Sequence, residues 1–129
     1  MTTAPTPGSL AWFEVAADDV DGAERFYSRL FDWKFAPDPE SEGAGIDYRV
    51  TTAPGGDTPM GGLVKAGPHT AGHAVFYILV ADVAATCATA EELGGSVVAQ
   101  ETSPPAGPAF AYLRDPGGNL FGVFTPPPS

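Results

Sequence analysis

Few side chains in this sequence of 129 residues are equipped for chemistry. The single cysteine, Cys87, excludes an intrachain disulfide and a cluster of metal-binding thiolates. The two histidines, His69 and His73, lie four residues apart in a segment that contains Gly and Pro, so no helix presets them as a pair of metal ligands. We interpret them as two exposed imidazoles in a linker. No nucleophile in the sequence stands beside a base.

Glu14 differs from most other acidic residues because it lies inside an alternating apolar segment, residues 10–17. This alternation predicts a strand with Trp12 and Glu14 on one face and Phe13 on the other. On such a strand, Glu14 could simply reach solvent at the rim. If it is buried beside Trp12, it becomes a candidate general base.

A helix is predicted directly after this strand. Asp18 or Asp19 can cap it, because a short carboxylate accepts hydrogen bonds from the first turn, and Asp32 ends it. We expect Phe26 and Tyr27 to pack the helix on the sheet, together with Trp33. The other apolar residues at the helical spacing are Val20, Ala23 and Leu30.

The same order of elements is predicted twice. In the first half, strands at residues 33–36, 46–52 and 59–66 follow the helix, and residues 37–45 form a loop. In the second half a helix begins after Asp82 and ends at Gly94-Gly95, with Cys87 on its core face and a tight turn at residues 115–119. The strands of the second half are predicted at residues 74–80, 96–100, 109–114 and 120–125.

The two halves align when Asp19-Val20 is matched with Asp82-Val83, 63 residues later. The fold class is therefore α+β, with two βαβββ modules whose curved mixed sheets enclose a cleft. We expect one compact domain. Its parts are an N-terminal tail at 1–9, modules at 10–66 and 73–125, a linker at 67–72 and a C-terminal tail at 126–129.

Composition excludes several functions. The formal charge is 6 − 16 = −10, which argues against nucleic-acid binding because phosphates need Lys and Arg. No apolar run reaches the roughly 18 residues of a membrane span. The first nine residues lack the order of a signal peptide, so we expect a cytoplasmic protein. The acidic excess is interpreted as a solvated face, or alternatively as a surface that attracts cationic ligands.

Several short motifs, in this order and spacing, resemble the vicinal oxygen chelate superfamily, also called the glyoxalase, bleomycin-resistance and dioxygenase superfamily. Together they span about residues 10 to 125. The resemblance implies paired βαβββ modules, a cleft on the concave side of the sheets and a homodimer. The motifs are Asp19-Val20, Phe26-Tyr27-x-x-Leu30-Phe31-x-Trp33, Val80-x-Asp82-Val83, Leu93-Gly94-Gly95 and Asp115-Pro116-Gly117-Gly118-Asn119.

Enzymes of that superfamily usually hold one divalent metal through His and Glu ligands. The resemblance places the ligand positions at Trp12, Val75 and Gly122 and in the segment Gly61–Leu63. None of these side chains offers a metal donor. We therefore expect no metal and no other cofactor.

The family pattern and strand alternation together predict a cleft of aromatic and aliphatic side chains with one carboxylate. Such a lining suits flat or amphipathic organic ligands, held by stacking and a few hydroxyl groups. The predicted lining residues are Trp12, Glu14, Tyr48, Met60, Val75, Tyr77, Phe110, Tyr112 and Phe124.

Three functional hypotheses follow. The first is a metal-free protein that binds a small aromatic or cationic molecule in the cleft, as in antibiotic sequestration. The second is a metal-independent isomerase, lyase or cyclase on a natural-product intermediate, with Glu14 as the base and Tyr48, Tyr77 or Tyr112 holding a developing oxyanion. The third is a metal-dependent lyase or dioxygenase with unusual ligands from Glu14, His69 and His73.

Overall fold

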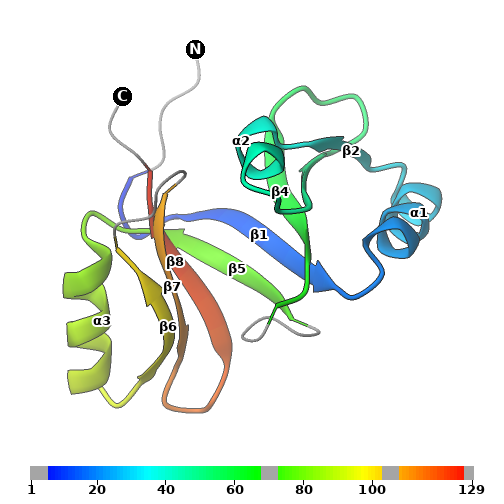
Figure 1. Ribbon diagram of the computed structural model, residues 1–129. Coiled ribbons are helices and arrows are strands. Elements are labelled where there is room, and N and C mark those ends of the chain that lie inside the picture. Colours follow the sequence, from blue (N-terminus) through cyan, green and yellow to red (C-terminus); the bar gives the residue numbers. More distant parts are fainter. Residues whose placement is uncertain (1–5, 68–72, 103–107, 127–129) are drawn as a thin grey trace. The chain divides into compact units, whose positions relative to one another are not determined.

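The computed structural model describes residues 6–67, 73–102 and 108–126 (Figure 1). It contains two compact units. The first unit is Trp12–Ala74, and the second joins the described residues up to Ala11 with those from Val75 onward. No helix in the described part of the chain is long and apolar enough to cross a membrane.

The first unit is a mixed sheet with two helices. Its strand order is β2-β3-β4-β1, in which β1 and β4 are parallel and the other neighbours antiparallel. The elements are β1 (Leu10–Ala17), α1 (Val20–Phe31), β2 (Lys34–Pro37), α2 (Pro39–Gly43), β3 (Tyr48–Thr52) and β4 (Pro59–Lys65).

The second unit is a mixed sheet with one helix, α3, which lies along β6 in Figure 1. Its strand order is β5-β8-β7-β6, and β5 and β8 are its parallel pair. Together the two units confirm the predicted α+β class with paired modules. The elements are β5 (Ala74–Leu79), α3 (Val83–Glu92), β6 (Ser96–Glu101), β7 (Ala109–Arg114) and β8 (Leu120–Thr125).

The long helices begin where the sequence places their caps. The Asp19 carboxylate accepts a hydrogen bond from Gly22 N (2.9 Å), and the Asp82 carboxylate accepts one from Ala85 N (3.0 Å). Asp32 ends α1 in the left-handed conformation, with φ 59°. These contacts confirm the predicted caps and fix where each helix leaves its strand.

The tight turn between β7 and β8 is also confirmed. The Asp115 carboxylate accepts hydrogen bonds from Asn119 Nδ2, Asn119 N and Gly117 N. These bonds, above all those from Asn119, hold the pKa of Asp115 below its usual value. The ionised side chain thus closes the turn that sets the register of β8 against β7.

One predicted loop is wrong, because residues 37–45 contain the short helix α2. The side chain of Asp38 caps this helix by accepting hydrogen bonds from Ser41 N (3.3 Å) and Ser41 Oγ (2.6 Å). Pro39 occupies the first helical position, where its missing N–H costs nothing. The following strand consequently begins at Tyr48 and not at Ile46.

The packing predicted for α1 is correct in part. Tyr27 stacks on Trp33 with ring centroids 5.3 Å apart, and Trp33 meets Phe13 of the sheet at 5.5 Å. Phe26 and Leu30, however, are 59% and 57% exposed. These two residues are four apart, so they share one side of the helix, rotated away from the side that Tyr27 turns to the sheet.

The core of the second unit lies between α3 and its sheet. Val83 and Cys87 of α3 pack on three buried residues of β7 and β8, Ala111, Leu113 and Val123. Cys87 is 3% exposed, and burial raises the pKa of its thiol. The prediction that Cys87 is a small core residue is therefore confirmed.

Two consecutive glycines in β4 let an aromatic ring lie on each face of the first sheet. A Cβ added at Gly61 would come within 2.6 Å of the Phe13 ring, on the α1 side. A Cβ added at Gly62 would overlap the phenol of Tyr48, on the opposite side. The missing side chains are therefore a packing requirement of this sheet.

Gly61→Ala should lower the free energy of unfolding by about 1–3 kcal/mol, because the new methyl group displaces the Phe13 ring. Gly43→Ala is the matched control, since a Cβ there meets nothing within 4 Å and the position is helical. Urea unfolding followed by circular dichroism measures both. Equal stability of the two variants would show that Phe13 does not lie over Gly61.

Candidate functional site

The face of the first sheet that turns away from α1 carries Trp12, Glu14 and Tyr48. Glu14 is paired with Gly62 of β4, and Tyr48 lies over that same glycine. The next residue of β3, Arg49, reaches in the opposite direction and binds Glu24 of α1 at 2.9 Å. Strand alternation therefore separates this face from the helix, as the sequence predicts.

A hydrogen bond ties two aromatic residues of this face together. Trp12 Nε1 donates to the phenol oxygen of Tyr48 at 2.9 Å. The two residues come from different strands, β1 and β3, so the bond spans the intervening strand β4. Both side chains are half-buried. The hydrogen bond thus joins two aromatic side chains on this face, and the Tyr48 ring covers Gly62.

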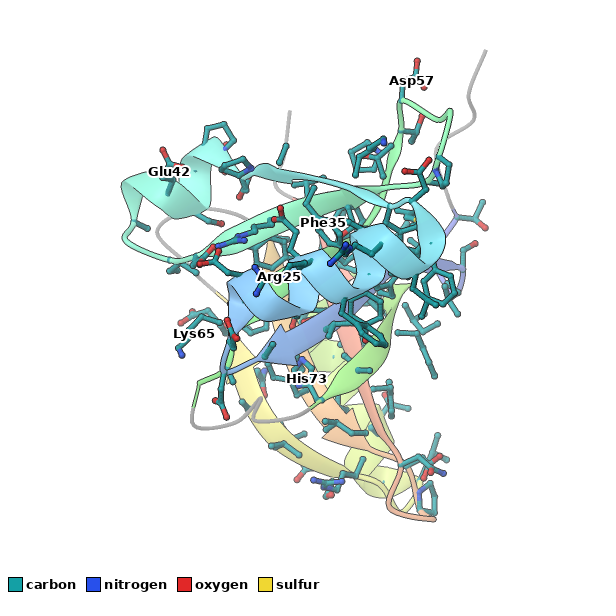
Figure 2. All side chains as sticks on the ribbon, turned by 90° about the vertical axis from the view of Figure 1, so that its right-hand side faces the viewer. Arg25, Phe35, Glu42, Asp57, Lys65 and His73 are labelled. Carbon is teal, nitrogen blue, oxygen red and sulfur yellow. The ribbon has the colours of Figure 1, made fainter. Side chains whose placement is uncertain are left out.

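Glu14 and His73 form a buried pair next to these two aromatic side chains. His73 Nε2 lies 3.0 Å from Glu14 Oε1, and the two residues are 7% and 5% exposed. The backbone carbonyl of His73 accepts a hydrogen bond from Ala16 N (2.9 Å), which holds the histidine against β1. Figure 2 shows His73 on the side of β1 away from α1.

The interpretation of His73 as an exposed linker imidazole is wrong. His73 directly precedes β5 and shares the strand parity of Val75, so its side chain continues a buried face of that strand. Parity of the residue before a strand was the signal that could have identified it. His69 lies outside the described residues, so its interpretation stays a prediction.

A carboxylate and an imidazole at hydrogen-bond distance can exchange a proton. Both groups are shielded from water, which strengthens the interaction between them. In this arrangement Glu14 is neither a rim carboxylate nor an isolated buried acid. Among the described residues of the first unit, this pair is thus best suited to acid–base chemistry.

The second unit presents four aromatic rings on the face of its sheet that turns away from α3. Tyr77 of β5 lies 6.0 Å from Tyr112 and 6.1 Å from Phe124, between ring centroids. Phe110 lies 5.6 Å from Tyr112. A Cβ at Gly122 would overlap the ring of Tyr77, so a glycine again allows a ring to lie flat on the sheet.

The other predicted lining residues lie on the same strands. Val75 is buried and shares the strand parity of Tyr77, and Met60 is half-buried two residues before Gly62. Each sheet thus brings together the predicted lining residues of its own module. Their contact with a ligand stays a prediction.

The metal positions implied by the family do not fit a metal in this chain. At the first position the indole N–H of Trp12 is a hydrogen-bond donor, which cannot ligate. Gly62 and Gly122 have no side chain, and the phenol rings of Tyr48 and Tyr77 cover them. The third hypothesis uses Glu14, His73 and His69, and stays a prediction because His69 lies outside the described residues.

The repeated strand–helix–strand order, with one mixed four-stranded sheet in each unit, defines a protein of the paired βαβββ class. A family model described as "Glyoxalase/Bleomycin resistance protein/Dioxygenase superfamily" matches residues 9–123. The chain belongs to this superfamily.

Curated relatives are similar to the chain over nearly all of its length. The putative glyoxylase CFP32 of Mycobacterium tuberculosis is 35% identical over 122 residues, which cover 94% of this chain and 45% of the relative. A glyoxylase-like domain-containing protein of Didymella fabae is 33% identical and covers 93% and 95%. The anthracycline biosynthesis protein DnrV of Streptomyces peucetius is 34% identical and covers 91% and 41%. The chain spans about half the length of CFP32 and DnrV.

Solved structures share the fold. The methylmalonyl-CoA epimerase of Mycobacterium tuberculosis superposes with a TM-score of 0.63 at 18% identity, and the match covers 99% of this chain and 94% of the epimerase. A hypothetical protein from Bacillus halodurans gives a TM-score of 0.62 at 13% identity, covering 94% and 96%. At these identities the likeness shows the fold alone.

His73→Leu should lower the free energy of unfolding by about 3–5 kcal/mol, because Glu14 then stays buried without this partner. The double variant Glu14→Leu/His73→Leu should cost less than the sum of the two single variants, since it leaves no carboxylate behind. Urea unfolding of the four proteins measures the coupling. Additive effects would contradict a direct interaction between the two side chains.

Proposed function

We propose that this chain is a metal-free protein that binds a small, flat aromatic or cationic organic molecule on the aromatic faces of its sheets. One observation carries the proposal: in both units, tyrosine rings lie over glycines on the sheet face that turns away from the helix. Such faces combine apolar rings with phenol groups: Tyr48 and Phe110 are half-buried, and Tyr77 and Tyr112 are 6% and 8% exposed.

The physical basis is stacking with a small number of polar contacts. Aromatic side chains desolvate a flat ligand at low entropic cost, and hydroxyl groups fix its orientation. The formal charge of −10 favours cations over anions at the surface. The name of the relative DnrV refers to anthracycline biosynthesis, which supports an aromatic natural product as the ligand class. Antibiotic sequestration is one form of this function.

The family resemblance and the composition add two elements to the proposal. The protein acts as a homodimer, and it is cytoplasmic. These elements rest on the resemblance and on composition.

Titration with an anthracycline and with bleomycin should give saturable binding for at least one of the two, measured by calorimetry. Phe110→Leu should weaken that binding about tenfold, because Phe110 belongs to the four-ring face. Phe76→Leu is the matched control, since Phe76 stacks on Phe121 in the same unit and is 45% exposed. An equal loss in both variants, or no saturable heat with either compound, would contradict the proposal.

The buried Glu14–His73 pair favours a second candidate function, a metal-independent isomerase, lyase or cyclase. Glu14 would remove a proton next to a carbonyl group, and His73 would share that proton across the 3.0 Å contact. The phenol of Tyr48 would hold the developing oxyanion, with Tyr77 or Tyr112 as alternatives. The relative CFP32 carries the name of a putative glyoxylase, which supports an enzyme.

Glu14→Gln should abolish exchange of the acidic C–H protons of a bound carbonyl compound for solvent deuterium, with a loss of about 100-fold or more. Nuclear magnetic resonance of 1,3-diketone probes in deuterated buffer measures the exchange. Glu92→Gln, at the exposed end of α3, is the control for the change in charge. Unchanged exchange in Glu14→Gln would rule out Glu14 as the base.

A further inference from the structure

A pocket lies in another part of the first unit, between α1, the α2 segment and the start of β3. Its volume is about 550 Å³ and it opens to solvent. This volume falls within the range of sites that take small organic ligands. The lining residues are Glu24, Phe35, Pro37, Glu42, Gly45, Ile46, Asp47, Tyr48 and Arg49.

The guanidinium of Arg49 in this pocket already binds three carboxylates. Arg49 donates to Asp47 through Nε and NH2 (3.0 Å each), to Glu24 through NH1 (2.9 Å) and to Asp21 through NH2 (2.7 Å). These four bonds use four of the five guanidinium protons. The bonds from Asp47 raise the pKa of Arg49, which is therefore permanently charged. An anionic ligand would have to compete with these three carboxylates for Arg49.

The lining therefore favours a positive ligand. It contains three carboxylates, from Glu24, Glu42 and Asp47, against the one guanidinium of Arg49, a formal sum of −3 + 1 = −2. Within the part of the chain that the structure describes, the Glu42 carboxylate makes no hydrogen bond to Arg49. Asp21 adds a further negative charge beside the pocket.

The pocket also offers apolar surface. Ile46 is 51% exposed, and Phe35 and Pro37 of β2 belong to the same lining. Figure 2 shows Phe35 and Glu42 on the same side of α1. A ligand that only carried charge would leave this apolar surface in water.

We propose that this pocket is a second binding site, which takes a small organic cation: an ammonium group carried on an aromatic or alkyl body. The ammonium lies against the carboxylates of Glu42 and Glu24, and the body covers Ile46 and Phe35. Arg49 acts as the positioning residue, because its guanidinium holds Glu24 of α1 and Asp47 at the start of β3 in one place.

The site is separate from the Glu14–His73 pair. Arg49 and Glu24 meet on the α1 side of the sheet, whereas Glu14 shares the opposite face with Tyr48. Tyr48 takes part in both lining sets, so it is a poor choice of variant for telling the sites apart. Glu42 lies on α2 and serves only the second site.

Three probes of one shape test the proposal on the whole chain: 4-phenylbutylammonium, 4-phenylbutan-1-ol and 4-phenylbutyrate. Calorimetry should show saturable binding of the ammonium compound, weaker binding of the alcohol and none of the carboxylate. Glu42→Gln should raise the Kd of the ammonium compound about threefold, as expected for the loss of a partly exposed charge pair. Added salt should weaken the ammonium compound and leave the alcohol unchanged.

Glu40→Gln is the matched control, because it removes the same charge from the same short helix but lies outside the pocket lining. Equal Kd values for the two variants would overturn the proposal, as would equal binding of the three probes. Phe110→Leu should leave this Kd unchanged, which separates a failure of the second site from a failure of the proposed aromatic site.

Discussion

Both sheets depend on one constraint: aromatic rings pack directly against glycines, where no side chain keeps them away from the backbone. In β4, Gly61 and Gly62 accept Phe13 on one face and Tyr48 on the other. In β8, Gly122 accepts Tyr77. A side chain at any of these three positions would lift a ring away from its sheet. Gly122 and the Gly61–Gly62 segment are also positions where the family resemblance implies metal ligands, and here they make room for aromatic rings.

The Glu14–His73 pair is hard to explain by stability alone. Burying two ionisable groups is costly, and apolar residues of similar volume often stabilise a core at least as well. Here the pair sits next to the Trp12–Tyr48 hydrogen bond, on a face with phenol and indole groups at hand. A buried polar pair at this position is better explained by a function, which is either to hold a polar group of the ligand or to move a proton. The two candidate functions assign different roles to the Glu14–His73 pair and use the same surrounding residues.

The sequence predicted the fold nearly completely, because the strand alternation, the caps at Asp19 and Asp82 and the Asp115 turn are local signals. It missed α2, whose Asp38-Pro39 start stands in a segment rich in Gly and Pro that is typical of loops. For the site, parity placed Trp12 and Glu14 on one face. The contact of Glu14 with His73 could not be predicted, because it joins residues 59 positions apart and depends on the exact docking of two strands.

In the first unit, the sheet separates two groups of ionisable side chains, one on each face. The α1 face holds the Arg49 network, in which one guanidinium binds three carboxylates and leaves a local negative excess. The opposite face holds the Glu14–His73 pair, whose carboxylate and imidazole lie within hydrogen-bond distance of each other. Screening is strong at the exposed carboxylates and weak at the buried pair, so salt acts mainly on the α1 side. An organic cation can therefore be attracted to one face by net charge, while a neutral aromatic molecule is favoured on the other by stacking and hydrogen bonds.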